Sequence, residues 1–111
     1  MRAVLPLGAL LGLAGAALAE APPALRKGTP YAKARAELMR LGWQPARLPD
    51  ADACPAGDAR CAGRPEMLAC SGTGVAACVF TWRRGGALIE VGTVGEETPS
   101  VSGVRCRSGC R

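Results

Sequence analysis

Six cysteines are the residues of this chain whose chemistry the sequence indicates most clearly. An even number of cysteines in a short exported chain is the usual sign of a disulfide framework. The intervening counts are six, eight, seven, 27 and three, so the C-x2-C spacing typical of zinc ligands and redox thiols does not occur. The sequence therefore predicts disulfides, no metal site and no cofactor. The cysteines are Cys54, Cys61, Cys70, Cys78, Cys106 and Cys110.

The pairing of these cysteines is not fixed by their number, but their positions favour some bridges. We expect Cys70 to pair with Cys78, because the two bracket a glycine-rich turn and the second opens the strongest strand signal. Cys54 with Cys61 and Cys106 with Cys110 come next, on proximity alone. The main alternative links the C-terminal pair to the 54–61 loop. Each bridge contributes roughly 2 to 4 kcal/mol by restricting the unfolded chain.

Acidic side chains are the other residues that could do chemistry. The chain has no histidine, which removes the commonest general base and the usual partner of a serine or cysteine nucleophile. Asp50, Asp52 and Asp58 share one loop, and Glu96 with Glu97 lies in another. Paired catalytic carboxylates need a rigid cleft around the scissile bond. These segments resemble turns, so we expect solvated charge and no catalytic residue.

Two features could bind anions. Residues 71–74, Ser-Gly-Thr-Gly, could cradle a phosphate with backbone N–H groups, but the lysine of a P-loop is missing and a turn is the simpler interpretation. Arginines near the hairpin tip and the C-terminus could form a basic patch for an anionic envelope polymer or an acidic protein, with a solvated rim as the alternative. We expect no nucleic-acid partner, because stacking aromatics are scarce. The patch would comprise Arg83, Arg84, Arg105, Arg107 and Arg111.

The first residues indicate export. Residues 1–19 are typical of a signal peptide, with Arg2, a short apolar run and an Ala-Leu-Ala cleavage site. We expect cleavage there, no membrane span afterwards, and no lipid anchor, because alanine stands where a lipoprotein box has its cysteine. Residues 20–28 should be a mobile leader and 29–111 a single domain. Removing Arg2 leaves 13 basic and 9 acidic residues, a net charge of +4.

The domain should open with one helix over residues 30–41. Thr29 can cap it, and Pro30 suits its first turn. An apolar stripe runs along this segment, which carries lysine, glutamate and arginine on another side. Gly42 is placed to end the helix in a left-handed conformation, with Trp43 folding back on Leu38.

A β-hairpin is the most specific structural signal. If Gly85 and Gly86 form its turn, residues whose numbers sum to 171 face each other. Trp82 then faces Ile89 and Phe80 faces Val91, so that these four side chains form the core face. The opposite face is more polar.

The remaining segments predict shorter strands. Residues 44–48 should be an edge strand because of Pro45, 67–70 a strand or one helical turn, and 101–104 a last short strand. We therefore expect an α+β domain, with one N-terminal helix on a three- to four-stranded, mainly antiparallel sheet stapled by disulfides.

Two local patterns resemble known proteins. Gly28, Ala34, Leu38 and Gly42, followed by Trp43, resemble the helix segment of PASTA domains, which implies a local helix-then-strand shape. PASTA repeats lack this cysteine framework, so no ligand-binding residue is carried over. Cys-x-Gly-Thr-Gly before a strand, with Pro-Tyr opening the helix and Gly-Trp closing it, is similar to small exported bacterial proteins without an assigned activity, and this implies a compartment only.

Three classes of function remain. The first is a non-catalytic binding or structural module of the bacterial envelope, periplasmic or secreted. The second is a protein inhibitor of an envelope or host enzyme, because a stapled loop is already ordered before it binds. The third and weakest is a hydrolase that acts through carboxylates.

Overall fold

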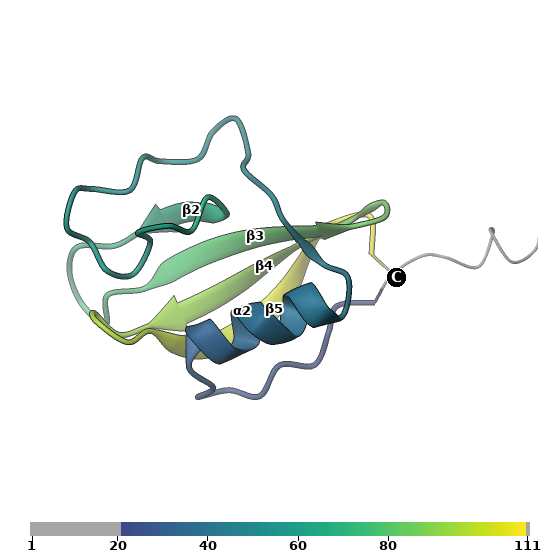
Figure 1. The fold of residues 1–111 in the computed structure, drawn as a ribbon, viewed down its shortest axis with the longest axis horizontal. Helices are drawn as coiled ribbons and strands as arrows, with labels where there is room; N and C mark the ends of the chain where they lie inside the picture. The colour runs from purple at the N-terminus through teal and green to yellow at the C-terminus, as the bar shows by residue number, and fades with distance from the viewer. Residues whose placement is uncertain (1–20, 111) are drawn as a thin grey trace, which may run out of the picture.

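The structure is a computed structural model that describes residues 21–110. The expected signal peptide, Glu20 and Arg111 lie outside the described residues. Five strands form one antiparallel sheet, in which β1 and β2 both pair with β3, and β4 and β5 follow on the other side. Helix α2 lies across one face (Figure 1). The fold is α+β and disulfide-stapled, as expected. The elements are α2 Tyr31–Arg40, β1 Gln44–Pro45, β2 Met67–Cys70, β3 Cys78–Arg84, β4 Ala87–Val94 and β5 Ser100–Ser108.

The two ends of α2 differ in how well the sequence predicts them. The C-terminal prediction is confirmed: Gly42 has φ +92°, and the Trp43 N–H donates to the Leu38 carbonyl at 2.9 Å. The expected Thr29 cap is wrong, since Pro30 stands at the N-cap and no side chain caps the helix. The Thr29 carbonyl accepts from the Val101 N–H, so this backbone extends along β5 before the helix begins.

The central hairpin has the predicted register. Trp82 faces Ile89 and Phe80 faces Val91, and all four side chains are fully buried. Tyr31 of α2 stacks on Phe80 with ring centroids 4.0 Å apart. The core therefore lies between α2 and one face of β3–β4.

The opposite face of the hairpin is less exposed to solvent than its polar residues suggest. Thr81 is buried, and its hydroxyl donates to the Ala46 carbonyl at 2.7 Å. Leu88 packs with Ala46 and Leu48 in a second, smaller cluster that Leu68 joins. The segment between β1 and β2 therefore covers part of this face.

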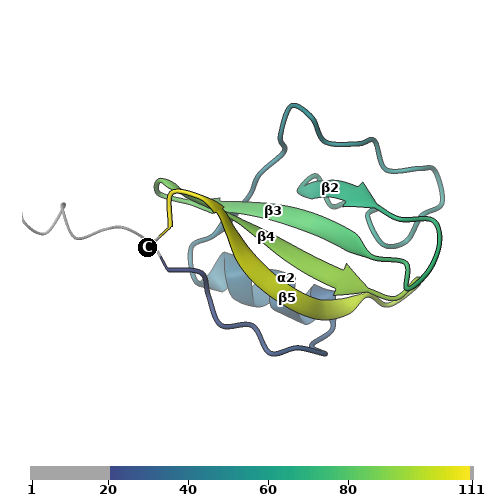
Figure 2. The same cartoon turned by 180° about the vertical axis from the view of Figure 1, so that it is seen from behind.

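β5 is longer than the expected strand at 101–104. It pairs with β4 from Ser100 to Ser108, with register shifts that leave Ser102 and Arg107 as extra residues. Such bulges bend a strand and re-aim its side chains. From behind, β3, β4 and β5 lie in front of α2 (Figure 2), and both bulges border the face that points away from the helix.

Three disulfides join Cys54 to Cys61, Cys70 to Cys78, and Cys106 to Cys110. These are the pairs that position along the chain favours. The second joins facing residues of β2 and β3. The segment 67–70, for which the sequence allows a strand or one helical turn, is a strand. Disulfides of this number in a small domain are typical of an oxidising compartment.

Part of the segment expected to be a mobile leader contacts the domain. Leu25 is partly buried against the core, and the Gly28 N–H donates to the Val101 carbonyl at 2.8 Å, so part of the segment 20–28 packs on the domain. Within residues 21–110, no helix is long and apolar enough to span a bilayer.

Candidate functional site

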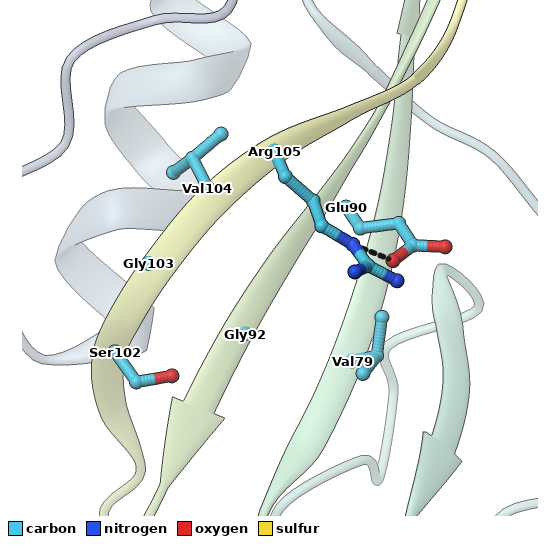
Figure 3. A pocket seen from close by; sticks show the side chains of 7 residues that line it. All are labelled: Val79, Glu90, Gly92, Ser102, Gly103, Val104 and Arg105. Carbon is cyan, nitrogen blue, oxygen red and sulfur yellow. Dashed lines mark hydrogen bonds and ion pairs between the residues drawn. The ribbon is translucent and has the colours of Figure 1, made fainter.

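A hollow of about 280 Å³ lies on the sheet face that points away from α2. Its floor is formed by Gly92 of β4 and Gly103 of β5, which face each other in the register. Figure 3 shows the lining side chains around this bare stretch of backbone. The lining residues are Val79, Glu90, Gly92, Ser102, Gly103, Val104 and Arg105. We call this cavity the open-face hollow.

The hollow exists because two facing positions carry no side chain. A Cβ added at Gly103 would meet nothing within 4 Å, whereas one at Gly92 would lie 3.0 Å from Ser102 Oγ. The bulge at Ser102 thus brings a hydroxyl to the rim, and a side chain at position 103 would occupy free space.

Glu90 and Arg105 form the charged wall of the hollow, and Arg107, which is not a lining residue, binds the same carboxylate. Arg105 lies directly opposite Glu90, and its Nε donates to Glu90 Oε1 at 2.8 Å. Arg107, the extra residue of the second bulge, donates through Nη1 to Glu90 Oε2 at 3.0 Å. Arg107 also lies 3.7 Å from the exposed carboxylate of Asp50. Both Glu90 oxygens are thus engaged, and two guanidinium groups share one buried carboxylate.

Glu90 and Arg105 differ in their exposure to solvent, and this determines which of them a ligand can reach. The Glu90 side chain is 10% exposed, while that of Arg105 is 79% exposed. Among residues 21–110 the Nη atoms of Arg105 make no hydrogen bond to a protein atom. The site therefore presents an exposed cation, hydrogen-bonded through Nε to Glu90, beside a glycine floor, and this arrangement suits the binding of an anion.

The arginines predicted as a basic patch divide into two groups. Arg105 and Arg107 meet at Glu90. Arg83 and Arg84 are exposed near the hairpin turn, and Arg84 Nε would lie 3.8 Å from a Cβ added at Gly42, after the end of α2. Arg111 lies outside the described residues.

Of the loop carboxylates, Asp58 forms the closest ion pair. Arg60 donates to both oxygens of Asp58, from Nε at 2.9 Å and Nη2 at 2.7 Å. Arg60 also donates to the Ser71 carbonyl at 2.6 Å, so it joins the 54–61 loop to the 70–78 loop. Asp58 and Arg60 line a second hollow of about 390 Å³ together with Glu96 and Glu97. Asp52 is exposed.

The Ser-Gly-Thr-Gly segment forms a turn, in which the Thr73 N–H donates to Ser71 Oγ at 3.2 Å. The turn lies inside the loop closed by Cys70 and Cys78.

The pair of Asp58 and Arg60 makes a pH-dependent prediction. The hydrogen bonds from Arg60 lower the pKa of Asp58. Because the folded pKa is depressed, the stabilisation is complete above the unfolded value of about 3.9 and is lost as pH falls through the folded pKa. A carboxyl ¹³C titration should place the midpoint of Asp58 below about 3.9, and Arg60→Gln should raise it. An unchanged midpoint in the variant would remove Arg60 as the cause.

A buried polar network joins the helix to the sheet, and the sequence analysis missed it. Glu66 is fully buried, and it accepts hydrogen bonds from Tyr31 Oη at 2.7 Å and from Arg35 at 2.6 and 3.0 Å. Trp82 Nε1 donates to Tyr31 Oη at 3.0 Å. Burial, and then the charge of Glu66, raises the pKa of Tyr31, which keeps the phenol a donor. The one sequence signal is an acidic residue directly before β2, whose first residue, Met67, is buried.

Comparison with protein-family models, curated proteins and solved structures gives no match to this chain. The resemblances to PASTA domains and to small exported bacterial proteins therefore stay predictions.

Proposed function

We propose that this chain is a small exported, disulfide-stabilised domain that acts as a non-catalytic binding module of the bacterial envelope, periplasmic or secreted. The open-face hollow carries this proposal, because its glycine floor and the residues of its charged pair, Glu90 and Arg105, belong to the paired strands β4 and β5. A site on rigid strands is already ordered before its ligand arrives, which lowers the entropic cost of binding. The signal-like first residues and the three disulfides support the compartment. The partner is an anionic envelope polymer or an envelope protein.

A capture experiment tests the proposal. The immobilised, oxidised protein should retain one reproducible partner from an envelope extract. Gly103→Val places side-chain atoms in the hollow, where an added Cβ meets nothing within 4 Å, so this variant should lose the partner. Gly86→Val is the matched control, because an added Cβ at this turn position also meets nothing within 4 Å and the residue lies outside the open-face hollow. Equal capture by the Gly103→Val variant would contradict a role for the hollow.

A protein inhibitor is the second candidate, and one observation favours it. The 70–78 loop is held by its disulfide, by Arg60, and by a 2.9 Å bond from the Gly95 N–H to the Val75 carbonyl. Val75 on this loop is 67% exposed, so a rigid loop presents an apolar side chain. An inhibitor would abolish the turnover of a captured enzyme at stoichiometric amounts, and Val75→Ser would weaken it. Unimpaired turnover of the partner would remove this candidate.

A further inference from the structure

We infer that the open-face hollow binds the C-terminal carboxylate of a peptide that ends in a small aliphatic residue. This inference rests on the function proposed above, and it adds the class of ligand. It follows from the balance of charge in the wall, from the free donors of Arg105, and from the few polar groups of the lining.

The charge of the wall selects an anion. Arg105 and Arg107 carry two positive charges, and Glu90 compensates one of them. Asp50 lies 3.7 Å from Arg107, so Arg107 is held between two carboxylates. The exposed guanidinium of Arg105 is therefore the cation that an incoming carboxylate would meet.

The geometry of Arg105 favours a carboxylate with two oxygens. The Nε of Arg105 donates to Glu90 at 2.8 Å, which places the guanidinium beside Glu90 among the lining residues (Figure 3). Its Nη atoms make no hydrogen bond within the described chain. A planar guanidinium suits a carboxylate with its paired donors.

The rest of the lining favours a slim aliphatic body. Besides the charged pair, Ser102 supplies the one side-chain hydroxyl of the lining, and Val79, Val104 and the Cα atoms of the two glycines supply apolar surface. A sugar acid carries a hydroxyl on nearly every carbon, and each would lose its water for want of a partner. A small aliphatic residue buries its carbon atoms without that cost, while Ser102 Oγ can serve one peptide group.

The size of the hollow limits the ligand. A volume of about 280 Å³ is at the lower end of ligand pockets. It accommodates the last one or two residues of a peptide, and the preceding residues would extend into solvent.

The test is an NMR titration of the oxidised, ¹⁵N-labelled protein with N-acetyl-alanyl-alanine. The amide signals of Gly92 and Gly103 should shift in a saturable manner. The C-terminal amide of the same dipeptide has the same body without the charge, and it should bind about tenfold more weakly or worse, since a hydrogen bond between charged groups is replaced. Glucuronate tests the sugar-acid alternative.

Two variants locate the site. Arg105→Gln should weaken the dipeptide about tenfold, while Arg107 still holds Glu90. Gly103→Val should abolish the shift of the Gly92 amide, and its melting temperature should not fall, because valine favours strands and its Cβ has free space here. Arg83→Gln removes the same charge near the hairpin turn and should leave binding unchanged.

Failure of the inference and failure of the proposed function give different results. Equal binding of the dipeptide and its amide, or binding of glucuronate in its place, would overturn the carboxy-terminal ligand. If no probe shifts the glycine signals while Gly103→Val still abolishes capture from an envelope extract, the ligand class is wrong and the binding module stands. If the variant keeps the captured partner as well, the hollow has no part in binding.

Discussion

Replacing Glu66 with alanine should lower the free energy of unfolding by about 3 kcal/mol, because it breaks a buried ion pair and leaves its partners without an acceptor. Glu66 is fully buried and accepts from Tyr31 and twice from Arg35. Arg35 keeps about a quarter of its side chain exposed, so it can regain some hydration, and we expect the lower end of the range for buried pairs. Urea unfolding followed by tryptophan fluorescence measures the loss.

Glu37→Ala is the matched control. Glu37 pairs with Arg40 three residues on, and both side chains are largely exposed. Surface pairs of this kind contribute about 0 to 0.5 kcal/mol. Both variants remove one glutamate from an arginine partner, so the difference between them measures the effect of burial. A loss at Glu66 no larger than that at Glu37 would show that the network does not stabilise the fold.

A double-mutant cycle separates the ion pair from general packing. If Glu66 and Arg35 act together, Arg35→Met in the Glu66→Ala background should cost little further, because the guanidinium has already lost its partner. Tyr31→Phe should also destabilise the protein, since Trp82 Nε1 then loses its acceptor. Strictly additive losses for Glu66 and Arg35 would mean that each residue contributes on its own.

The features of the fold that follow from local pattern are predictable from the sequence. The Gly85–Gly86 turn and the alternation around it permit one register that sorts apolar from polar side chains, and that register is observed. The helix C-terminus is likewise determined by Gly42 and Trp43. The start of the helix is not determined in this way, and the predicted Thr29 cap is wrong. The backbone before the helix pairs instead with β5, more than 70 residues further along the chain.

The site depends on contacts that the local pattern does not contain. The length of β5 is set by pairing with β4, since glycine and arginine at 103, 105 and 107 give a weak strand signal. The sequence without that pairing places Arg105 and Arg107 in the C-terminal tail. It places Glu90 on the polar face of the hairpin. The hydrogen-bonded partners in the Glu66 network are separated by 31 to 51 positions, so no local periodicity connects the helix residues to Glu66 and Trp82.

Reduction of the three disulfides should unfold the protein or leave it close to its midpoint at room temperature. The bridges close loops with separations of 7, 8 and 4 residues, for which chain entropy gives about 2 kcal/mol each. Their sum of about 6 kcal/mol is comparable to the whole stability of a domain of this size, about 5 to 10 kcal/mol. Circular dichroism during thermal unfolding, with and without strong reductant, measures the effect. An unchanged melting curve in reductant, with all six thiols titratable, would mean that the sheet persists without its crosslinks.

Removing the bridges one at a time should lower the free energy of unfolding by different amounts. Cys70→Ala with Cys78→Ala should cost the most, about 3 kcal/mol, because it frees β2 from the central strand and deletes the buried sulfur of Cys78. The Cys54–Cys61 pair should follow, since Cys61 is also buried and Arg60 still holds the loop to Ser71. Cys106→Ser with Cys110→Ser should cost the least, because that loop is short and largely exposed. Urea unfolding with a common m-value tests this order. An equal loss of stability for all three pairs would show that loop entropy alone determines the contribution of each bridge, and that strand pairing has no part in it.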